Sequence, residues 1–297
     1  MKILVVGLVE NEQVDRLWQE AYKRGHNLVG CYTKELTVLS DTGSFNPTLR
    51  GKKLDDFNLI YFWAPGTRRW DWYAVGEYLH SKFKTILVNE KIVDPTVNYN
   101  PSILKDYLLQ SQNSIPYPKS AVIYSVKSLE SVAPNFTFPL IVKLAEGKQG
   151  KSVYKADSKD DLHKIVGELE SMKQGVVLRE FIPNDGDVRV FTIGYKAVGA
   201  MKRIPKKGEF RSNISQGGRG EKFDLNKYPE IRDIAEKASR VARVEIAGVD
   251  VIINKNTGKP YVLEVNPGPQ FLGIEKYTKV NIALEIINYF EKLYSER

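Results

Sequence analysis

Apolar runs and segments of helical periodicity alternate over the first part of the chain. Runs of consecutive apolar residues are typical of strands buried on both faces, and the segments between them have the spacing of amphipathic helices. The expected strands are 3–9, 27–32, 59–63 and 85–88, and the expected helices are 14–24 and 70–83. This alternation predicts an open parallel α/β sheet that ends near residue 95.

The pattern changes after residue 95. We expect a helix at 102–112, which Pro101 can open, and then a unit of short strands and helices. The expected strands of that unit are 121–124, 140–144, 152–155 and 176–181, and its helices are 126–132 and 158–172, the second with Ser158 as N-cap. The last third predicts antiparallel hairpins at 188–203 and 248–265 and helices at 228–244 and 280–294.

These elements define a fold class and a division of the chain. The class is α/β, with α+β character in the last third. The predicted domains are an N-terminal α/β domain at 1–95, a central domain at 96–178 and a C-terminal domain at 179–297. Each is long enough to contribute to a sizeable core.

Composition narrows the setting. With 42% hydrophobic and 27% charged residues, the chain has the make-up of a globular protein. Its one cysteine, Cys31, excludes an internal disulfide and a cysteine-based zinc site, and it is expected to be a small core residue. The apolar start ends at Glu10 with no cleavage signal, and no stretch is long enough to span a membrane. We expect a cytoplasmic protein.

The positive charge is concentrated in one stretch. Of the net charge of +8, residues 196–222 carry most, because eight basic residues there are opposed only by Glu209 and Glu221. A cluster of this kind indicates an anionic partner, and nucleic acid, nucleotide phosphates and acidic peptides all qualify. A solvated surface loop is the alternative.

Three oxygen-bearing side chains near the end of the chain predict a metal site. Glu264 and Asn266 are two residues apart on an expected strand, so their side chains share a face. The turn before them can place Asp250 opposite. Two carboxylates and an amide oxygen on apolar strands are hard ligands that suit Mg²⁺. The alternative is that both acids pair with lysine or arginine.

A lysine and a glycine-rich loop predict a phosphate site. Lys143 ends an apolar strand, where its charge is costly unless it is used, and the loop 145–152 follows. The ending Gly150-Lys151-Ser152 is that of a P-loop, but Ala145 stands where the first glycine is needed and no helix follows. We interpret the loop as a lid whose backbone N–H groups close over phosphates.

The segment 177–183 is a candidate for the nucleotide base. An extended linker with free backbone groups can hydrogen-bond an adenine edge. A simple strand explains the same pattern.

Six motifs then occur in one order along the chain. They are Lys143 with its glycine loop, Glu180-Phe181-Ile182, Asp187-Val188-Arg189, Phe210-Arg211-Ser212-Asn213 followed by Gly217-Gly218, Ala247-Gly248-Val249-Asp250, and Leu263-Glu264-Val265-Asn266-Pro267. Each is weak alone, but together they resemble the RimK-like branch of the ATP-grasp ligases, the alpha-L-glutamate ligases, over residues 85–295. The resemblance implies an ATP-grasp fold preceded by a pre-ATP-grasp domain.

The resemblance also implies roles for individual residues. It places Lys105, Lys143, Arg211, Ser212 and Asn213 on the nucleotide phosphates, Glu180, Phe181 and Ile182 on adenine, and Asp187 near the ribose. It places Asp250, Glu264 and Asn266 on two Mg²⁺ ions, for which Mn²⁺ can substitute. Arg189, Arg203 and Arg211 are the implied catalytic residues, the first two beside the transferred phosphoryl group and the acceptor carboxylate.

The implied reaction is ATP-dependent joining of a carboxylate to an amine through an acyl phosphate. The implied amine is an amino acid such as glutamate, and the acceptor is an acidic peptide, a protein tail or a small acid. The family also suggests a homodimer or homotetramer. After Asn266 the chain departs from the family, with two prolines and Phe271 before Gly273-Ile274-Glu275-Lys276, in a segment expected to line the acceptor pocket.

Other functions remain open from sequence. One is an ATP-grasp ligase acting on a different small acid. A nucleic-acid-binding protein would use the basic stretch 196–222, but interleaved exposed aromatic residues are absent there. A non-catalytic nucleotide-binding module would not need the set of Asp250, Glu264 and Asn266.

Overall fold

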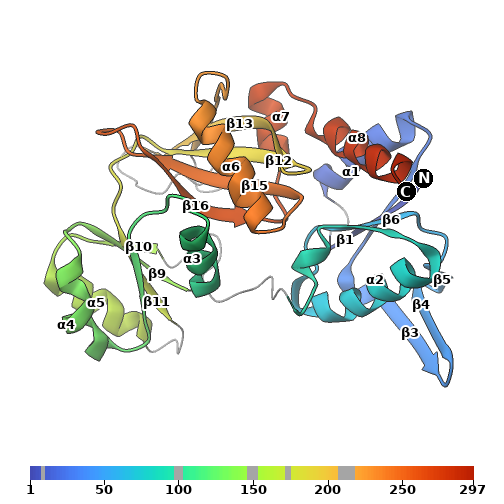
Figure 1. Cartoon of the computed structure of the whole chain (residues 1–297), viewed down its shortest axis with the longest axis horizontal. Coiled ribbons are helices and arrows are strands. Elements are labelled where there is room, and N and C mark those ends of the chain that lie inside the picture. Colours follow the sequence, from blue (N-terminus) through green and yellow to red (C-terminus); the bar gives the residue numbers. More distant parts are fainter. Residues whose placement is uncertain (8–10, 97–102, 146–152, 171–174, 207–217) are drawn as a thin grey trace.

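The computed structural model contains four β-sheets in the described part of the chain, an N-terminal, a central and a C-terminal sheet and a small fourth one (Figure 1). It describes residues 1–7, 11–96, 103–145, 153–170, 175–206 and 218–297. Among these residues, the structure contains no helix of the length and apolarity needed to cross a membrane.

The N-terminal sheet is parallel, as predicted. Its order is β2 (Asn27–Cys31), β1 (Lys2–Val6), β6 (Leu59–Phe62) and β7 (Ile86–Val88), with helices α1 (Glu12–Lys23) and α2 (Arg69–Phe83). Side chains of β1 alternate between two cores: Ile3 and Val5 pack with Leu17, and Leu4 packs with Trp72. Because both faces are covered, the strand is continuously apolar in sequence. Cys31 is buried, and burial raises the pKa of its thiol to about 12.

A small antiparallel sheet extends away from this unit (Figure 1). It consists of β3 (Leu36–Asp41), β4 (Ser44–Leu49) and β5 (Lys52–Lys53). The sequence did not predict it, because β3 is exposed along most of its length and therefore has no apolar face to mark it.

The central sheet is antiparallel and is covered by helices on one face. Its order is β10 (Val153–Ala156), β9 (Leu140–Leu144), β11 (Val176–Glu180) and β8 (Ser120–Ile123), and the helices are α4 (Leu129–Val132) and α5 (Lys159–Glu170). The hydroxyl of Ser158 accepts the backbone N–H of Asp161 at 3.1 Å, which confirms the predicted N-cap. Helix α3 (Ile103–Gln112) precedes this sheet.

The C-terminal sheet is also antiparallel. Its order is β14 (Arg219–Lys222), β13 (Lys196–Ile204), β12 (Asp187–Ile193), β15 (Ile246–Ile253) and β16 (Pro260–Asn266). Helix α6 (Pro229–Val241) covers one face, and α7 (Leu272–Thr278) with α8 (Ile282–Ser295) packs at the other. Strand β14 and helix α7 were not predicted from the sequence.

The end of the chain returns to its beginning. Helix α8 lies beside α1 (Figure 1), and Ile286 and Phe290 share one apolar core with Ile3, Tyr61 and Phe191. This core joins the N-terminal sheet to the C-terminal sheet, so the N-terminal unit is packed directly against the part of the chain that follows β16.

Candidate active site

The predicted metal ligands are brought together. Strands β15 and β16 pair with Asp250 opposite Glu264 and Gly248 opposite Asn266. The amide nitrogen of Asn266 lies 3.0 Å from Oε1 of Glu264 and 3.5 Å from Oδ2 of Asp250. The flanking side chains Val249 and Val251 point into the core under α6, so the polar cluster occupies the opposite face of the sheet.

Two arginines from the neighbouring strands hold Asp250. Arg189 on β12 donates to both carboxylate oxygens of Asp250, with Nη2 2.7 Å from Oδ2. Arg203 on β13 lies 2.9 Å from Oδ2 of Asp250 and also binds Asp187, with Nε 2.7 Å from Oδ1. Two of the three implied catalytic arginines therefore bind the implied metal ligand Asp250, while Asp187, predicted at the ribose, is the partner of Arg203.

The pKa values of the two metal-site carboxylates shift in opposite directions. Burial raises the pKa of Asp250, but Arg189 and Arg203 outweigh it and hold the pKa below its ordinary value. Burial first, and then the adjacent Asp250, raises the pKa of Glu264. Among the described residues Glu264 forms no ion pair with a lysine or arginine. The alternative interpretation, pairing with basic residues, thus holds for Asp250 and does not hold for Glu264.

The residues present fit a divalent cation. Glu264 is desolvated beside another carboxylate, and its pKa stays raised despite the charge of Lys143, so a bound cation would stabilise its ionised form. Mg²⁺ is usually bound by one or two carboxylates together with phosphate oxygens of the substrate. The amide of Asn266 would turn its oxygen towards the ion, since its present orientation follows from the hydrogen bonds it makes without one.

A second group of charges lies on the central sheet. Lys143 on β9 and Arg179 on β11 share the face that turns away from α4 and α5, because Lys143 pairs with Val177 and Arg179 with Ile141. Burial first, and then the charge of Arg179, lowers the pKa of Lys143 to about 8, against the opposing effect of Glu264 and Asp106. Lys143 therefore lies within electrostatic range of Glu264 and Asp106.

Arg179 is a functional candidate that the sequence did not single out. Its side chain is only 7% exposed, and its Nη2 donates to the hydroxyl of Tyr107 at 3.0 Å. Its Nε is buried without a hydrogen-bond partner, and no carboxylate pairs with it in the described part of the chain. A desolvated guanidinium without an anion is suited to bind one. The available signal was a charged residue within the apolar strand 176–180, as for Lys143.

Helix α3 contributes Asp106 to the same region. Burial raises the pKa of Asp106 to about 6, with Lys143 lowering it and Glu264 raising it. The side chains of Asp106 and Glu264 are partly accessible to solvent. Neighbouring protein atoms nevertheless displace water around both carboxylates and so raise their pKa. Lys105, which the family resemblance places on the phosphates, is exposed in the first turn of α3, and its role stays a prediction.

The predicted base-binding segment 177–183 is a linker only in its last part, because 177–180 belong to β11 and pair with β8 and β9, as the simple-strand alternative expects. The backbone N–H of Glu180 donates to the carbonyl of Lys119 at 2.9 Å, the ring of Phe181 lies under Lys155, and Ile182 is buried. Gly186 ends the linker at φ +111°, where a Cβ would lie 2.2 Å from the carbonyl oxygen of Arg203. Only glycine fits this close approach, which sets Asp187 against Arg203. Contact of 180–182 with adenine stays a prediction.

Part of the predicted phosphate site lies outside the described residues. It comprises the lid 146–152 and the segment 207–217, with Arg211, Ser212 and Asn213.

The low pKa of Lys143 gives a testable pH dependence. Lys143 must be protonated to bind phosphate, so the affinity for Mg·ADP should fall as the pH rises above about 8. Replacement Lys143→Met should weaken binding about 10- to 100-fold at pH 7, corresponding to about 1.5–3 kcal/mol for a charged hydrogen bond, and should remove this pH dependence. Titration calorimetry between pH 7 and 9.5 measures both effects.

Lys143→Arg serves as the matched control. Arginine stays charged over this range, so it should retain most of the affinity and give a flat profile. A wild-type protein whose affinity does not change between pH 7.5 and 9.5 would contradict the assignment of Lys143 to the phosphates.

Comparison with known proteins identifies the class. A model of the RimK-like ATP-grasp domain matches residues 103–290, and the chain belongs to this family. A probable alpha-L-glutamate ligase of Vibrio vulnificus (strain YJ016) is 30% identical over 98% of this chain and 96% of that protein. A probable alpha-L-glutamate ligase of Legionella pneumophila (strain Corby) is 40% identical, but the match spans only 62% of this chain and 61% of that relative.

Solved structures agree on the fold. The ATP-grasp ligase PsnB, complexed with a phosphomimetic variant of its minimal precursor, Mg and ADP, superposes with a TM-score of 0.74 at 18% identity, covering 98% of each chain. The D-cycloserine synthetase DcsG gives a TM-score of 0.66 at 15% identity, covering 99% of this chain and 100% of that chain. The predicted ATP-grasp fold is confirmed, as is the resemblance to the RimK-like branch.

Proposed function

We propose that this chain is an ATP- and Mg²⁺-dependent ligase that activates a carboxylate as an acyl phosphate and joins it to an amino acid, with glutamate as the first candidate. One observation carries the proposal. Among the described residues, Glu264 lies opposite Asp250 without an ion-pair partner and within electrostatic range of Lys143, while Arg179 is buried without a carboxylate. Unmatched negative and positive groups near one another are suited to a divalent cation and a triphosphate, which neutralise both.

The chain's own residues then have distinct roles. Asp250, Glu264 and Asn266 would hold Mg²⁺, one or two ions, and Mn²⁺ has the same ligand preference. The cation would draw charge from the phosphate oxygens. Lys143 and Arg179 would bind phosphate oxygens from the central sheet. Arg189 and Arg203 fix Asp250 and would present their remaining N–H groups to the acceptor carboxylate.

The reaction needs no nucleophilic side chain from the protein. The carboxylate oxygen of the acceptor attacks the γ-phosphorus of ATP, the bond to ADP breaks, and an acyl phosphate forms. The amine then attacks the carbonyl carbon, phosphate leaves, and the amine loses a proton. Both steps accumulate negative charge on oxygen, which positive groups held in place stabilise.

The acceptor class follows from the relatives and from charge. The curated relatives are described as probable alpha-L-glutamate ligases, and PsnB was solved with a precursor peptide. With a net charge of +8, this chain favours an acidic partner, so we propose an acidic peptide, a protein tail or a small acid.

A phosphate-release screen tests the proposal. Amino acids are paired with acidic acceptors in the presence of ATP and Mg²⁺, and products are identified by mass spectrometry. We expect ADP and phosphate only when carboxylate and amine are both supplied, with a product heavier than the acceptor by one amino acid residue. Full-rate ATP turnover without either substrate would refute the ligase assignment.

A further inference from the structure

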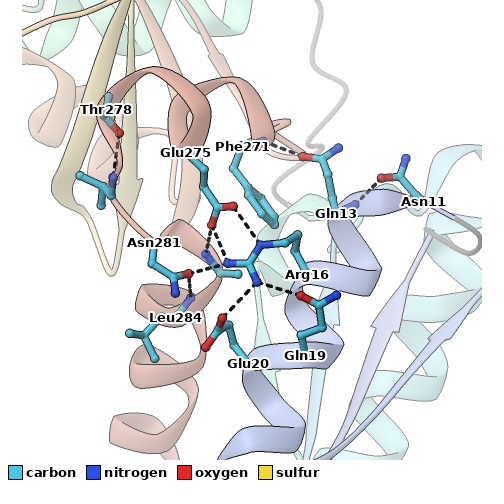
Figure 2. Close-up of polar contacts among 12 residues, drawn as sticks. Asn11, Gln13, Arg16, Gln19, Glu20, Phe271, Glu275, Thr278, Asn281 and Leu284 are labelled. Carbon is cyan, nitrogen blue, oxygen red and sulfur yellow. Dashed lines mark hydrogen bonds and ion pairs between the residues drawn. The ribbon is translucent and has the colours of Figure 1, made fainter.

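The segment that follows the metal ligands is held by the N-terminal unit. It begins at Pro267, directly after Asn266, and continues into helix α7. Asn89 donates from its amide to the carbonyl of Pro267 at 3.1 Å. The side-chain oxygen of Gln13 on α1 accepts the backbone N–H of Phe271 at 2.6 Å (Figure 2). Both side chains are buried, so each bond satisfies a polar group that water does not reach.

Arg16, one helical turn after Gln13, fixes the next part of the segment. Its Nε lies 3.1 Å from Oε2 of Glu275 on α7, and its Nη2 lies 2.9 Å from Oδ1 of Asn281, which caps α8 (Figure 2). Glu20 approaches the same guanidinium at 3.0 Å. Glu275 also accepts the backbone N–H of Ala283 at 3.0 Å. One arginine therefore joins α1 to both α7 and the start of α8.

Two glycines mark where the segment 267–278 packs closely against its surroundings, one of them beside the metal site. A Cβ on Gly268 would lie 2.7 Å from the carbonyl oxygen of Trp63, so the segment runs directly against the end of β6. A Cβ on Gly248 would lie 2.9 Å both from Cβ of Pro269 and from Cδ of Arg189. Pro269 and Arg189 thus pack over the same glycine, and Arg189 holds Asp250. A shift of the segment would change the packing at this glycine, next to the arginine that holds Asp250.

Phe271 anchors this segment in the apolar core. It is fully buried against Trp63 and Phe191, with ring centroids 5.8 Å and 6.3 Å away. The apolar core already binds α8 to the N-terminal sheet. The hydrogen bonds of Gln13 and Arg16 fix the position of the segment more closely than apolar contact does, because hydrogen bonds require particular distances and angles.

We propose that Gln13 and Arg16 of α1 are positioning residues for the acceptor carboxylate. They hold the segment 267–278 against Arg189, so the N-terminal unit sets the affinity for the acceptor without touching the nucleotide. This inference rests on the proposed ligase function.

Steady-state kinetics of Arg16→Met test it, with Arg24→Met as the matched control. Arg24 is the C-cap of the same helix and also pairs with the last helix, at 3.0 Å from Glu291, but in the described structure it makes no polar contact with 267–278. We expect Arg16→Met to raise the KM of the acceptor at least tenfold and to change the KM of ATP less than twofold. Arg24→Met should change neither, and Arg16→Lys should fall between wild type and Arg16→Met.

The outcomes separate the two proposals. An active wild type with an unchanged acceptor KM in Arg16→Met, or with both KM values raised equally, overturns the positioning role alone. A wild type without substrate-dependent phosphate release overturns the ligase function first. Should Arg16→Met not fold, Gln13→Met, which removes only the acceptor for the N–H of Phe271, is judged by the same two KM values.

Discussion

Replacing Glu264 with glutamine should reduce ligase turnover about 1,000-fold or more and leave the fold at least as stable as in the wild type. The loss follows because the side chain can no longer neutralise a divalent cation, and metal stabilisation of transition-state charge amounts to several kcal/mol. The free energy of unfolding, in contrast, should not fall. The pKa of Glu264 is raised in the folded protein, so its ionised form costs free energy at neutral pH, and neutral glutamine removes this cost.

Turnover and urea denaturation without added metal measure the two effects together. Glu236→Gln is the matched control, since Glu236 on α6 pairs with Lys196 of β13, whose side chain is 70% exposed, away from the site. It should retain turnover. Residual activity of Glu264→Gln within tenfold of the wild type, or a marked loss of stability, would show that Glu264 is a structural residue.

Replacing Arg203 with methionine should lower the free energy of unfolding by about 3–5 kcal/mol, the typical cost of breaking a buried ion pair from one side. Arg203 is 7% exposed and bonds Asp187 and Asp250, which are 6% and 3% exposed. Without it Asp187 remains buried with no basic partner among the described residues. Urea denaturation at pH 7 measures the effect.

Lys196→Met on the same strand is the control for this change. Lys196 pairs with Glu236 at the surface, and exposed ion pairs contribute about 0–1 kcal/mol. Equal losses for the two variants would mean that the cluster of Arg189, Arg203, Asp187 and Asp250 does not act as a buried network.

Local patterns in the sequence were sufficient for the strands that carry the site. Strand alternation places Glu264 and Asn266 on one face. The position of Lys143 within an apolar strand makes it a candidate for binding an anion. These two inferences needed only neighbours along the chain. The pairing of β15 with β16 was predicted from the turn that joins them into a hairpin.

Contacts between distant segments were not accessible in this way. The bonds of Arg189 and Arg203 to Asp250 depend on the order of strands in the sheet, which periodicity does not specify. The bond between Arg16 and Glu275 joins residues 259 positions apart, and α7 is short and follows two prolines, so no periodic signal marks it. Strand β3 was missed because it is exposed along most of its length.

The division into domains at residues 95 and 178 stays a prediction. The core shared by β1, α1 and α8 shows why a boundary drawn along the sequence is incomplete: the last helix packs on the first sheet. This packing gives the N-terminal unit its access to the segment after the metal ligands.

Anomalous scattering of Mn²⁺ in crystals grown with ADP tests most directly whether Asp250, Glu264 and Asn266 hold the metal ion. We expect an ion coordinated by carboxylate oxygens of Asp250 and Glu264 and by the amide oxygen of Asn266, with the diphosphate on its other side towards Lys143. An ion bound to the nucleotide alone, with Glu264 outside its coordination sphere, would contradict this expectation.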